Sequence, residues 1–112
     1  MKYIVAIIQP YKLDEVRREL ENVDVNLLTV SNVMGRGRQK GFTDAYRGNQ
    51  EFVLLKKIKL EIAVNEDFVE ATIAAISKGA HTGNPGDGKI FVLDLGDVVR
   101  IRTGERSEVA IG

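Results

Sequence analysis

The feature that most constrains the fold of this chain is the order in which two kinds of hydrophobic pattern alternate along it. Strand-like apolar runs lie at 2–8, 25–33, 54–64 and 89–95. Stretches with helical spacing separate the first run from the second and the third from the fourth, at 13–22 and 68–78. Because a period of two marks a strand and a period of about 3.6 marks a helix, the sequence predicts the order β-α-β-β-α-β.

Side chains expected in the core follow these two periods. In the run at 54–64 the charged residues 57, 59 and 61 alternate with an apolar set of Ile58, Leu60, Ile62 and Val64. This alternation predicts a strand with one buried face. The inward residues of the helices are expected to be Leu13, Val16 and Leu20, then Phe68, Val69, Thr72, Ile73 and Ile76. Asn65 or Asp67 is expected to cap the second helix.

The order of elements predicts an α+β, ferredoxin-like sandwich. At 112 residues the chain is expected to form one domain, 1–112, with a short fifth strand at 98–101. Two helices can cover only one face of a four-stranded sheet. The other face is therefore expected to meet a partner, most simply another copy of the chain.

Composition narrows the classes of function. The 16 acidic and 16 basic residues balance, which argues against a general nucleic-acid binder, since that binding needs excess positive charge. Without cysteine there is neither a disulfide nor a thiolate metal site, and the single histidine, His81, is expected to be structural. The N-terminal run is strand-like rather than a leader, and no apolar segment reaches the ~20 residues that span a bilayer. A cytoplasmic protein is expected.

A long connection without periodicity lies between the second and third strand-like runs. Residues 35–51 contain four glycines and several charges, and connections beyond about 12–15 residues are usually functional. Phe42 and Tyr46 are candidate anchors for a partner. A tolerated insertion is the alternative, because loop length costs little entropy. The basic run GRGRQK also leaves a nucleic-acid contact open.

The segment TGNPGDGKIF, at 82–91, indicates an anion site. Its glycines permit positive φ, so that consecutive backbone N–H groups can turn toward one anion, and Lys89 adds a charge that suits phosphate. Arg100 and Arg102 lie two apart, which on a strand would place both guanidinium groups on one face. Together these groups predict a polyphosphate site, most simply a nucleotide site. The alternatives are a plain glycine turn and surface ion pairs.

Several motifs together resemble the P-II nitrogen-regulatory signal-transduction family. They are IVAIIQPYKLDEVRREL, GRGRQKGFTDAYRG, TGNPGDGKIFV and RIRTGE, in this order and over essentially the whole chain. The resemblance implies a homotrimer of ferredoxin-like subunits with nucleotide sites in the clefts between them. It implies a T-loop at about 36–53 that docks on targets, a B-loop at 82–89 and a C-loop at 102–106. It also implies binding of ATP or ADP, and of 2-oxoglutarate together with Mg²⁺ and ATP.

The resemblance assigns roles by position. The nucleotide-binding residues it implies are Thr29, Gly35, Gly37, Arg38, Ala63, Gly86, Asp87, Gly88 and Lys89, with Arg100 and Arg102 from the neighbouring subunit. Those for 2-oxoglutarate are Gln39, Lys57, Gly86 and Lys89, and Gln39 would also bind Mg²⁺. Those that would dock on a partner are Phe42, Tyr46, Arg47 and Glu51. The implied partners are an ammonium transporter, glutamine synthetase or its regulators, or nitrogenase, with membrane contact only through a transporter.

The chain departs from the family pattern at the tip of the predicted T-loop. Many bacterial members carry a modifiable tyrosine in a YRGAEY-like stretch, whereas this chain reads YRGNQEF. Gln50 or Glu51 falls at the modified position, and Asn49 stands where some members have a serine. Neither replacement has a hydroxyl group, so the protein is not expected to be uridylylated. Leu27 also replaces a frequent glycine on the adenine side.

The expected function is that of a sensor and not of an enzyme. A related alternative is the subgroup that acts on nitrogenase directly. A small ATP-hydrolysing enzyme is a more remote alternative, for which Asp87 is the acidic residue within the glycine segment. An RNA-binding module of the same topology would stack bases on exposed aromatic residues of its central strands, and Tyr3 and Phe91 do not make that pattern.

Overall fold

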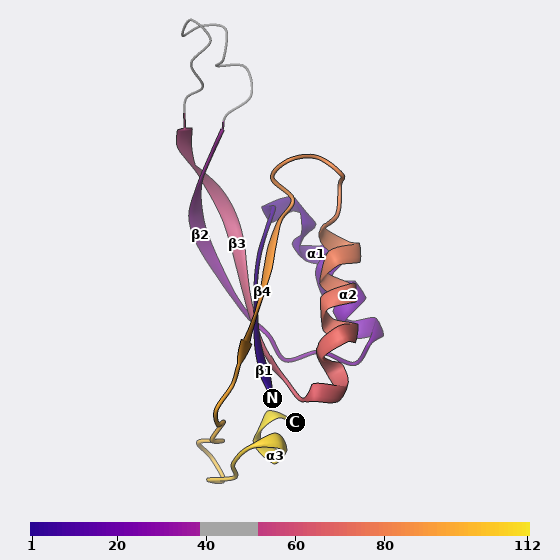
Figure 1. Cartoon of the computed structure of the whole chain (residues 1–112), viewed down its shortest axis with the longest axis vertical. Helices are drawn as coiled ribbons and strands as arrows, with labels where there is room; N and C mark the ends of the chain where they lie inside the picture. The colour runs from indigo at the N-terminus through magenta and orange to yellow at the C-terminus, as the bar shows by residue number, and fades with distance from the viewer. Residues whose placement is uncertain (39–51) are drawn as a thin grey trace, which may run out of the picture.

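The computed structural model of the chain describes residues 1–38 and 52–112. The sheet is antiparallel and has the spatial order β2-β3-β1-β4 (Figure 1). Its strands are β1 (Lys2–Ile8), β2 (Thr29–Arg38), β3 (Phe52–Val64) and β4 (Gly88–Asp94). The helices that connect them are α1 (Leu13–Asn22) and α2 (Val69–Ala80), which begin after the 3-10 turns η1 (Pro10–Lys12) and η2 (Glu66–Phe68). The predicted ferredoxin-like α+β fold is confirmed.

The core lies between the helices and one face of the sheet. The alternating residues predicted for β3 are buried, and on β1 Ile4, Ala6 and Ile8 lie on the same face. Val16 and Leu20 from α1 and Ile76 from α2 are also buried. Full burial of one such aliphatic side chain contributes about 1.5–3 kcal/mol, so this cluster is the main source of stability.

The two helices approach each other closely at Gly79. A Cβ atom on this glycine would lie 2.7 Å from the Cα of Val16 and 2.8 Å from its backbone nitrogen. Thr72, fully buried on the same helix, satisfies its hydroxyl by donating to the carbonyl oxygen of Phe68 at 2.7 Å. Small and internally bonded side chains therefore let α1 and α2 pack side by side on the sheet.

Three local expectations were wrong. Val25 is buried, but it lies in the connection before β2, so its apolar character reflects core packing and not strand pairing. Phe68 is 40% exposed because it precedes α2 rather than facing inward from it. Neither Asn65 nor Asp67 makes a side-chain cap, because the 3-10 turn 66–68 leads into the helix instead.

The predicted fifth strand does not form. Residues 98–101 contribute only an isolated bridge, between Val99 and Arg106. A turn follows at 101–103, where Gly104 N donates to the carbonyl oxygen of Arg100 at 2.8 Å. The chain then ends in a short helix, α3 (Glu108–Ile111). Bonds within this segment replace the sheet pairing that its β-branched residues suggested.

The hairpin formed by β2 and β3 projects beyond the rest of the sheet. β3 pairs with β1 only from Ile58 to Val64, whereas it pairs with β2 from Phe52 to Glu61. β2 therefore runs into the predicted 35–51 connection as far as Arg38, and β3 begins two residues before the predicted 54. Figure 1 shows the hairpin reaching past β1 and β4. The residues between them, 39–51, lie outside the described part of the chain.

The face of the sheet opposite the helices carries apolar side chains that are not fully covered. Phe91 and Leu93 on β4 are each 48% exposed. They pair with Val5 and Tyr3 of β1, on the face opposite the buried Ile4. We call this surface the open face. Among the described residues no helix is long and apolar enough to span a membrane.

Candidate functional site

The glycine-rich connection between α2 and β4 is closed by the carboxylate of Asp87. This carboxylate accepts hydrogen bonds from the backbone N–H groups of Thr82 at 2.7 Å and Gly83 at 2.9 Å, and from the Thr82 hydroxyl. The Thr82 hydroxyl and these N–H groups lower the pKa of Asp87 from 3.8 to about 2. Asp87 therefore holds the loop together through its side chain.

The loop adopts the backbone conformations for which the sequence provides glycine. Gly83, Gly86 and Gly88 have φ values of +90°, +100° and +110°. At Gly88 a Cβ atom would also lie 1.8 Å from the carbonyl oxygen of Ile7, so no other residue fits where the loop joins β4. The predicted use of positive φ is confirmed at these positions.

The loop is tied to the base of the hairpin through the carbonyl oxygen of Gly86. Gln9, which follows β1, donates to this oxygen from Nε2 at 2.6 Å. Lys57, on β3, donates to the same oxygen from Nζ at 3.4 Å. A residue that follows β1 and a residue of β3 therefore position one peptide group of the loop.

Two cavities lie where the loop meets the hairpin. The first has a volume of about 550 Å³ and is lined by Gln9, Tyr11, Arg36, Gly37, Leu55, Lys57, Thr82, Asn84, Pro85, Gly86 and Asp87. The second, about 460 Å³, shares Arg36, Lys57, Asn84, Gly86 and Asp87 and adds Ile7, Gly35, Gly88, Lys89 and Phe91. Together they gather many of the predicted ligand-binding residues, with Lys57, Lys89 and Arg36 as cations. We call this region the loop–hairpin site.

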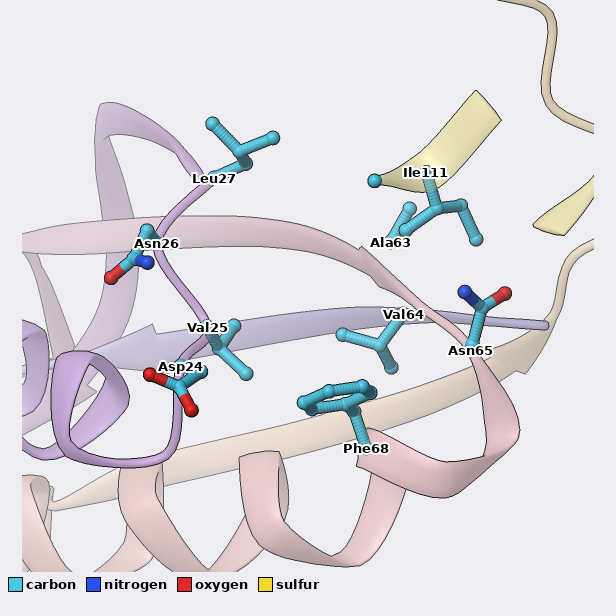
Figure 2. Close-up of a pocket in the computed structure, with 10 residues that line it drawn as sticks. Asp24, Val25, Asn26, Leu27, Ala63, Val64, Asn65, Phe68 and Ile111 are labelled. Atoms are coloured by element: carbon cyan, nitrogen blue, oxygen red, sulfur yellow. The ribbon is translucent and has the colours of Figure 1, made fainter. Parts of the chain in front are cut away.

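A third cavity, of about 290 Å³, lies where β2 begins and β3 ends (Figure 2). Its lining is Asp24, Val25, Asn26, Leu27, Ala63, Val64, Asn65, Phe68, Ile111 and Gly112. The predicted residue Ala63 belongs here and not to the loop–hairpin site. Thr29, which is exposed, begins β2 and pairs with Glu61 near the same end of the sheet. We call this cavity the sheet-end cavity.

The two predicted phosphate-binding arginines are not in the loop–hairpin site. Arg100 and Arg102 follow the end of β4, whereas Lys89 lies at its start, and residues 89–94 of a strand span about 17 Å. Because the fifth strand is absent, the expectation that both arginines share one strand face was wrong. Arg102 is exposed in the turn at 101–103.

Arg100 instead bonds to the end of the chain. Its Nη1 lies 2.6 Å from Oε1 of Glu105, and its Nη2 donates to the carbonyl oxygen of Val109 at 3.1 Å and to that of Gly112. Both ends of the guanidinium group are thus engaged within residues 105–112.

Several predicted residues lie outside what the structure describes. Gln39, Phe42, Tyr46, Arg47 and Glu51 belong to 39–51, and of Arg38 only the backbone, in β2, is described. Within 1–38 and 52–112 no group of three His, Asp or Glu side chains could hold a metal ion. Mg²⁺ usually takes only one or two protein ligands together with substrate phosphates.

The sequence did not predict two uncharged residues that hold the glycine-rich loop in place through hydrogen bonds. Gln9 and Thr82 act through hydrogen bonds to the loop backbone or to Asp87. The signal for Thr82 was available, because a threonine and an aspartate flanking a glycine-rich segment often close a turn through their side chains. Gln9 gave no such signal, since its partner lies 77 residues away.

Comparison with known proteins identifies the family. The family model for nitrogen regulatory protein P-II matches residues 1–105. The chain is 53% identical over 114 residues to nitrogen regulatory protein GlnK1 of Methanosarcina mazei, covering 99% of this chain and 97% of the relative. It is 53% identical to nitrogen regulatory protein P-II of Pasteurella multocida and 51% identical to nitrogen regulatory protein P-II 1 of Escherichia coli K12, over 112 residues, 99% of this chain and 100% of each relative. The chain therefore belongs to the nitrogen regulatory protein P-II family.

Proposed function

We propose that this P-II protein is a cytoplasmic sensor of ATP or ADP and 2-oxoglutarate that regulates nitrogen assimilation by docking residues 39–51 on target proteins. The observation that carries the proposal is the loop–hairpin site. A cavity of about 550 Å³ joins the glycine-rich loop to the base of the hairpin that bears those residues, and Lys57 contacts both elements. A ligand bound there would act directly on the two strands that lead to the docking segment.

The nucleotide phosphates would lie against the glycine-rich loop. Gly86, Gly88 and the backbone of Asp87 would offer N–H groups, and Lys89 would add its charge. Gly35, Gly37 and Arg38 would complete the phosphate end from β2. Thr29 and Ala63 lie at the other end of the sheet from the glycine-rich loop, so they would contact the adenine ring from a neighbouring copy, beside the sheet-end cavity that Ala63 lines.

A second copy of the chain would supply Arg100 and Arg102. Both arginines follow the far end of β4 from Lys89, so one copy does not bring them to its own phosphate loop. A homotrimer would solve this, because a ring of head-to-tail contacts places the end of one subunit against the start of the next. The half-exposed Phe91 and Leu93 of the open face support such self-association.

2-Oxoglutarate would bind beside the nucleotide in the loop–hairpin site. Its distal carboxylate would pair with Lys57, whose ammonium group already lies 3.4 Å from the Gly86 carbonyl oxygen. Gln39 would hold Mg²⁺ together with the nucleotide, and when bound the ion would neutralise phosphate and keto-acid oxygens. Two negative charges need such partners to offset their loss of water.

The output would be a change in the conformation presented by residues 39–51. A ligand shifts such an equilibrium only by its differential affinity, and a change from 1:99 to 99:1 needs a preference of roughly 10⁴-fold. The targets would be an ammonium transporter, glutamine synthetase or its regulators, or nitrogenase, contacted through Phe42, Tyr46, Arg47 and Glu51. Without a tyrosine at the tip, effectors and not uridylylation would set the state.

The position of Asp87 supports a regulator rather than an ATP-hydrolysing enzyme. An enzyme would need this carboxylate as a general base with a free lone pair toward a bound water. Instead its oxygens accept bonds from Thr82 and Gly83 within the loop, and its pKa of about 2 makes it a weak base.

Calorimetric titration of 2-oxoglutarate into the protein saturated with Mg²⁺ and ATP tests the proposal. We expect binding that requires both Mg²⁺ and ATP and that is lost in Lys57→Ala. Lys59→Ala is the matched control, because Lys59 lies two residues away on the same face but pairs with Glu61 at 3.4 Å. Equal binding by Lys57→Ala and Lys59→Ala would overturn the role of Lys57, and no nucleotide binding by the unmodified protein would overturn the sensor itself.

A further inference from the structure

Arg100 bonds to residues 105–112 through both of its terminal nitrogens. Nη1 bonds Glu105 at 2.6 Å, and Nη2 bonds the carbonyl oxygens of Val109 and Gly112. A phosphate group is bound most strongly when it meets an arginine through two parallel N–H donors. The bonds to Val109 and Gly112 use both N–H groups of Nη2, and a paired contact with phosphate, made together with Nη1 or with Nε, needs one of them. Arg100 therefore cannot hold the segment and bind a phosphate in this way at the same time.

Residues 105–107 and residues 108–112 differ in how they are held. Arg106 pairs with Asp97, and the backbone N–H and hydroxyl of Ser107 donate to the same carboxylate at 3.3 and 3.4 Å. Ser107 N donates to the carbonyl oxygen of Val98 at 2.9 Å, and Asn65 Nδ2 donates to that of Glu108 at 3.3 Å. α3 has only 4 residues and no buried one. Ser107 itself has a φ of +60°, which is unfavourable for a residue with a side chain. Arg100, with Asn65, is therefore a principal tie of residues 108–112 to the body of the protein, whereas Asp97 and Val98 hold residues 106 and 107.

The segment also covers part of the sheet-end cavity. Ile111 and Gly112 line it, and Figure 2 shows Ile111 beside Ala63, opposite Val25 and Phe68. The side-chain oxygen of Asn65, in the same lining, is buried without a hydrogen-bond partner among the described residues. Departure of residues 108–112 would open this cavity and give that oxygen access to water.

We propose that residues 105–112 act as an internal competitor for Arg100. When the phosphates of a nucleotide held by a neighbouring copy engage Arg100, its bonds to Glu105, Val109 and Gly112 break. Residues 108–112 then leave the sheet-end cavity, while Asp97 keeps Arg106 and Ser107 in place. Nucleotide binding would thus change the conformation of residues 108–112 as well as that of the hairpin. This inference rests on the proposed nucleotide site between copies.

Titration of ATP into two matched variants of the full-length protein tests the competition. Glu105→Ala removes the carboxylate that Arg100 contacts, whereas Glu108→Ala removes the same charge from an exposed residue of α3. Among the described residues, the side chain of Glu108 is not a partner of Arg100. We expect Glu105→Ala to bind ATP about three- to five-fold more tightly, since an ion pair of this exposure is worth up to ~1 kcal/mol. Glu108→Ala should bind like the unmodified protein.

Amide hydrogen exchange gives a second, independent readout. Saturating ATP should speed exchange at Ala110, whose N–H group donates to the carbonyl oxygen of Ser107 within α3. Exchange at Ser107, whose N–H group is held by Val98 and Asp97, should stay unchanged. The competition would be contradicted if both variants bound ATP with equal affinity, or if ATP left exchange at Ala110 unchanged or slower. Neither result would contradict the proposed nucleotide site. If the unmodified protein does not bind ATP, the proposed function fails and this inference fails with it.

Discussion

Gly88 is a residue at which a single added carbon should disrupt the fold. Its φ is +110°, and a Cβ added to it would lie 1.8 Å from the Ile7 carbonyl oxygen, which leaves no room for alanine. We expect Gly88→Ala to lower the free energy of unfolding by roughly 2–4 kcal/mol, measured by urea denaturation. Gly96→Ala is the control, because a Cβ there meets nothing within 4 Å. Equal stability of the two variants would contradict the close packing of the loop on β1.

Asp87 should make the stability of the protein depend on acid pH in a defined direction. Its pKa of about 2 lies below the ordinary 3.8, so its contribution is complete above about pH 4 and is lost as the pH falls toward 2. Asp94 and Asp97 also have lowered pKa values, because they hydrogen bond the side chains of Lys2 and Arg106. The effect of Asp87 must therefore be taken as a difference between variants.

We expect Asp87→Asn to be less stable than the unmodified protein at pH 6, with a gap that narrows between pH 4 and pH 2. Urea denaturation at each pH measures the gap. Asp67→Asn, which changes an exposed carboxylate in η2, should keep the pH dependence of the unmodified protein. A gap for Asp87→Asn that stays constant over this range would show that its carboxylate does not hold the loop.

For individual residues, the sequence predicted which kinds of side chain and backbone conformation the site uses. It did not predict which atoms those side chains hydrogen bond. Lys57 was placed on the polar side of a strand, and the structure adds that it reaches the Gly86 carbonyl oxygen. The positive φ of the loop glycines was predictable because few other residues tolerate it. The bonds of Gln9 and Arg100 were not, because each depends on which distant backbone atoms the fold brings within reach.

At the scale of elements, the packing of α1 on α2 depends on the missing side chain of Gly79. Alanine normally stabilises a helix interior by up to about 1 kcal/mol relative to glycine. Here the added Cβ would overlap the backbone of Val16 at 2.7 Å, so we expect Gly79→Ala to destabilise the protein by roughly 1–3 kcal/mol. Thermal unfolding followed by circular dichroism measures this, and a variant more stable than the unmodified protein would contradict the close approach.

The elements with strong periodicity were the predictable ones. The alternation in 54–64 predicted the buried face of β3 correctly. Charged residues occupy one face of the strand, so only the apolar face can pack into the core. Residues 98–101 are also β-rich, yet they form only one bridge. Local propensity could not reveal this, because the outcome depends on competing bonds from Arg100 to residues that follow it.

For the whole molecule, the open face should be the surface that holds copies together. Leu93 lies on it at 48% exposure, and a glutamate there would bury an unpaired charge in an assembled oligomer. We expect Leu93→Glu to sediment as a smaller species than the unmodified protein. Leu54→Glu is the control, since Leu54 is 64% exposed but lies on the opposite side of the sheet, in register with Arg36. If Leu54→Glu dissociates the protein and Leu93→Glu does not, another surface makes the assembly.

The proposed nucleotide site combines the glycine-rich loop of one copy with Arg100 and Arg102 of another. Lys89→Ala and Arg102→Ala each damage one half of this site. When the two variants carry different tags and are co-expressed, purification on both tags in turn isolates mixed oligomers. In a ring of three, each mixed trimer then contains about one interface with both intact halves.

ATP titration of these mixed trimers is the most direct measurement. We predict that each variant alone loses tight binding, whereas the mixed trimer regains about one site with the affinity of the unmodified protein. If Lys89 and Arg102 instead served the same site within one chain, every site in the mixture would lack one of them. Mixed trimers that bind ATP no better than either variant alone would therefore contradict a site shared between copies.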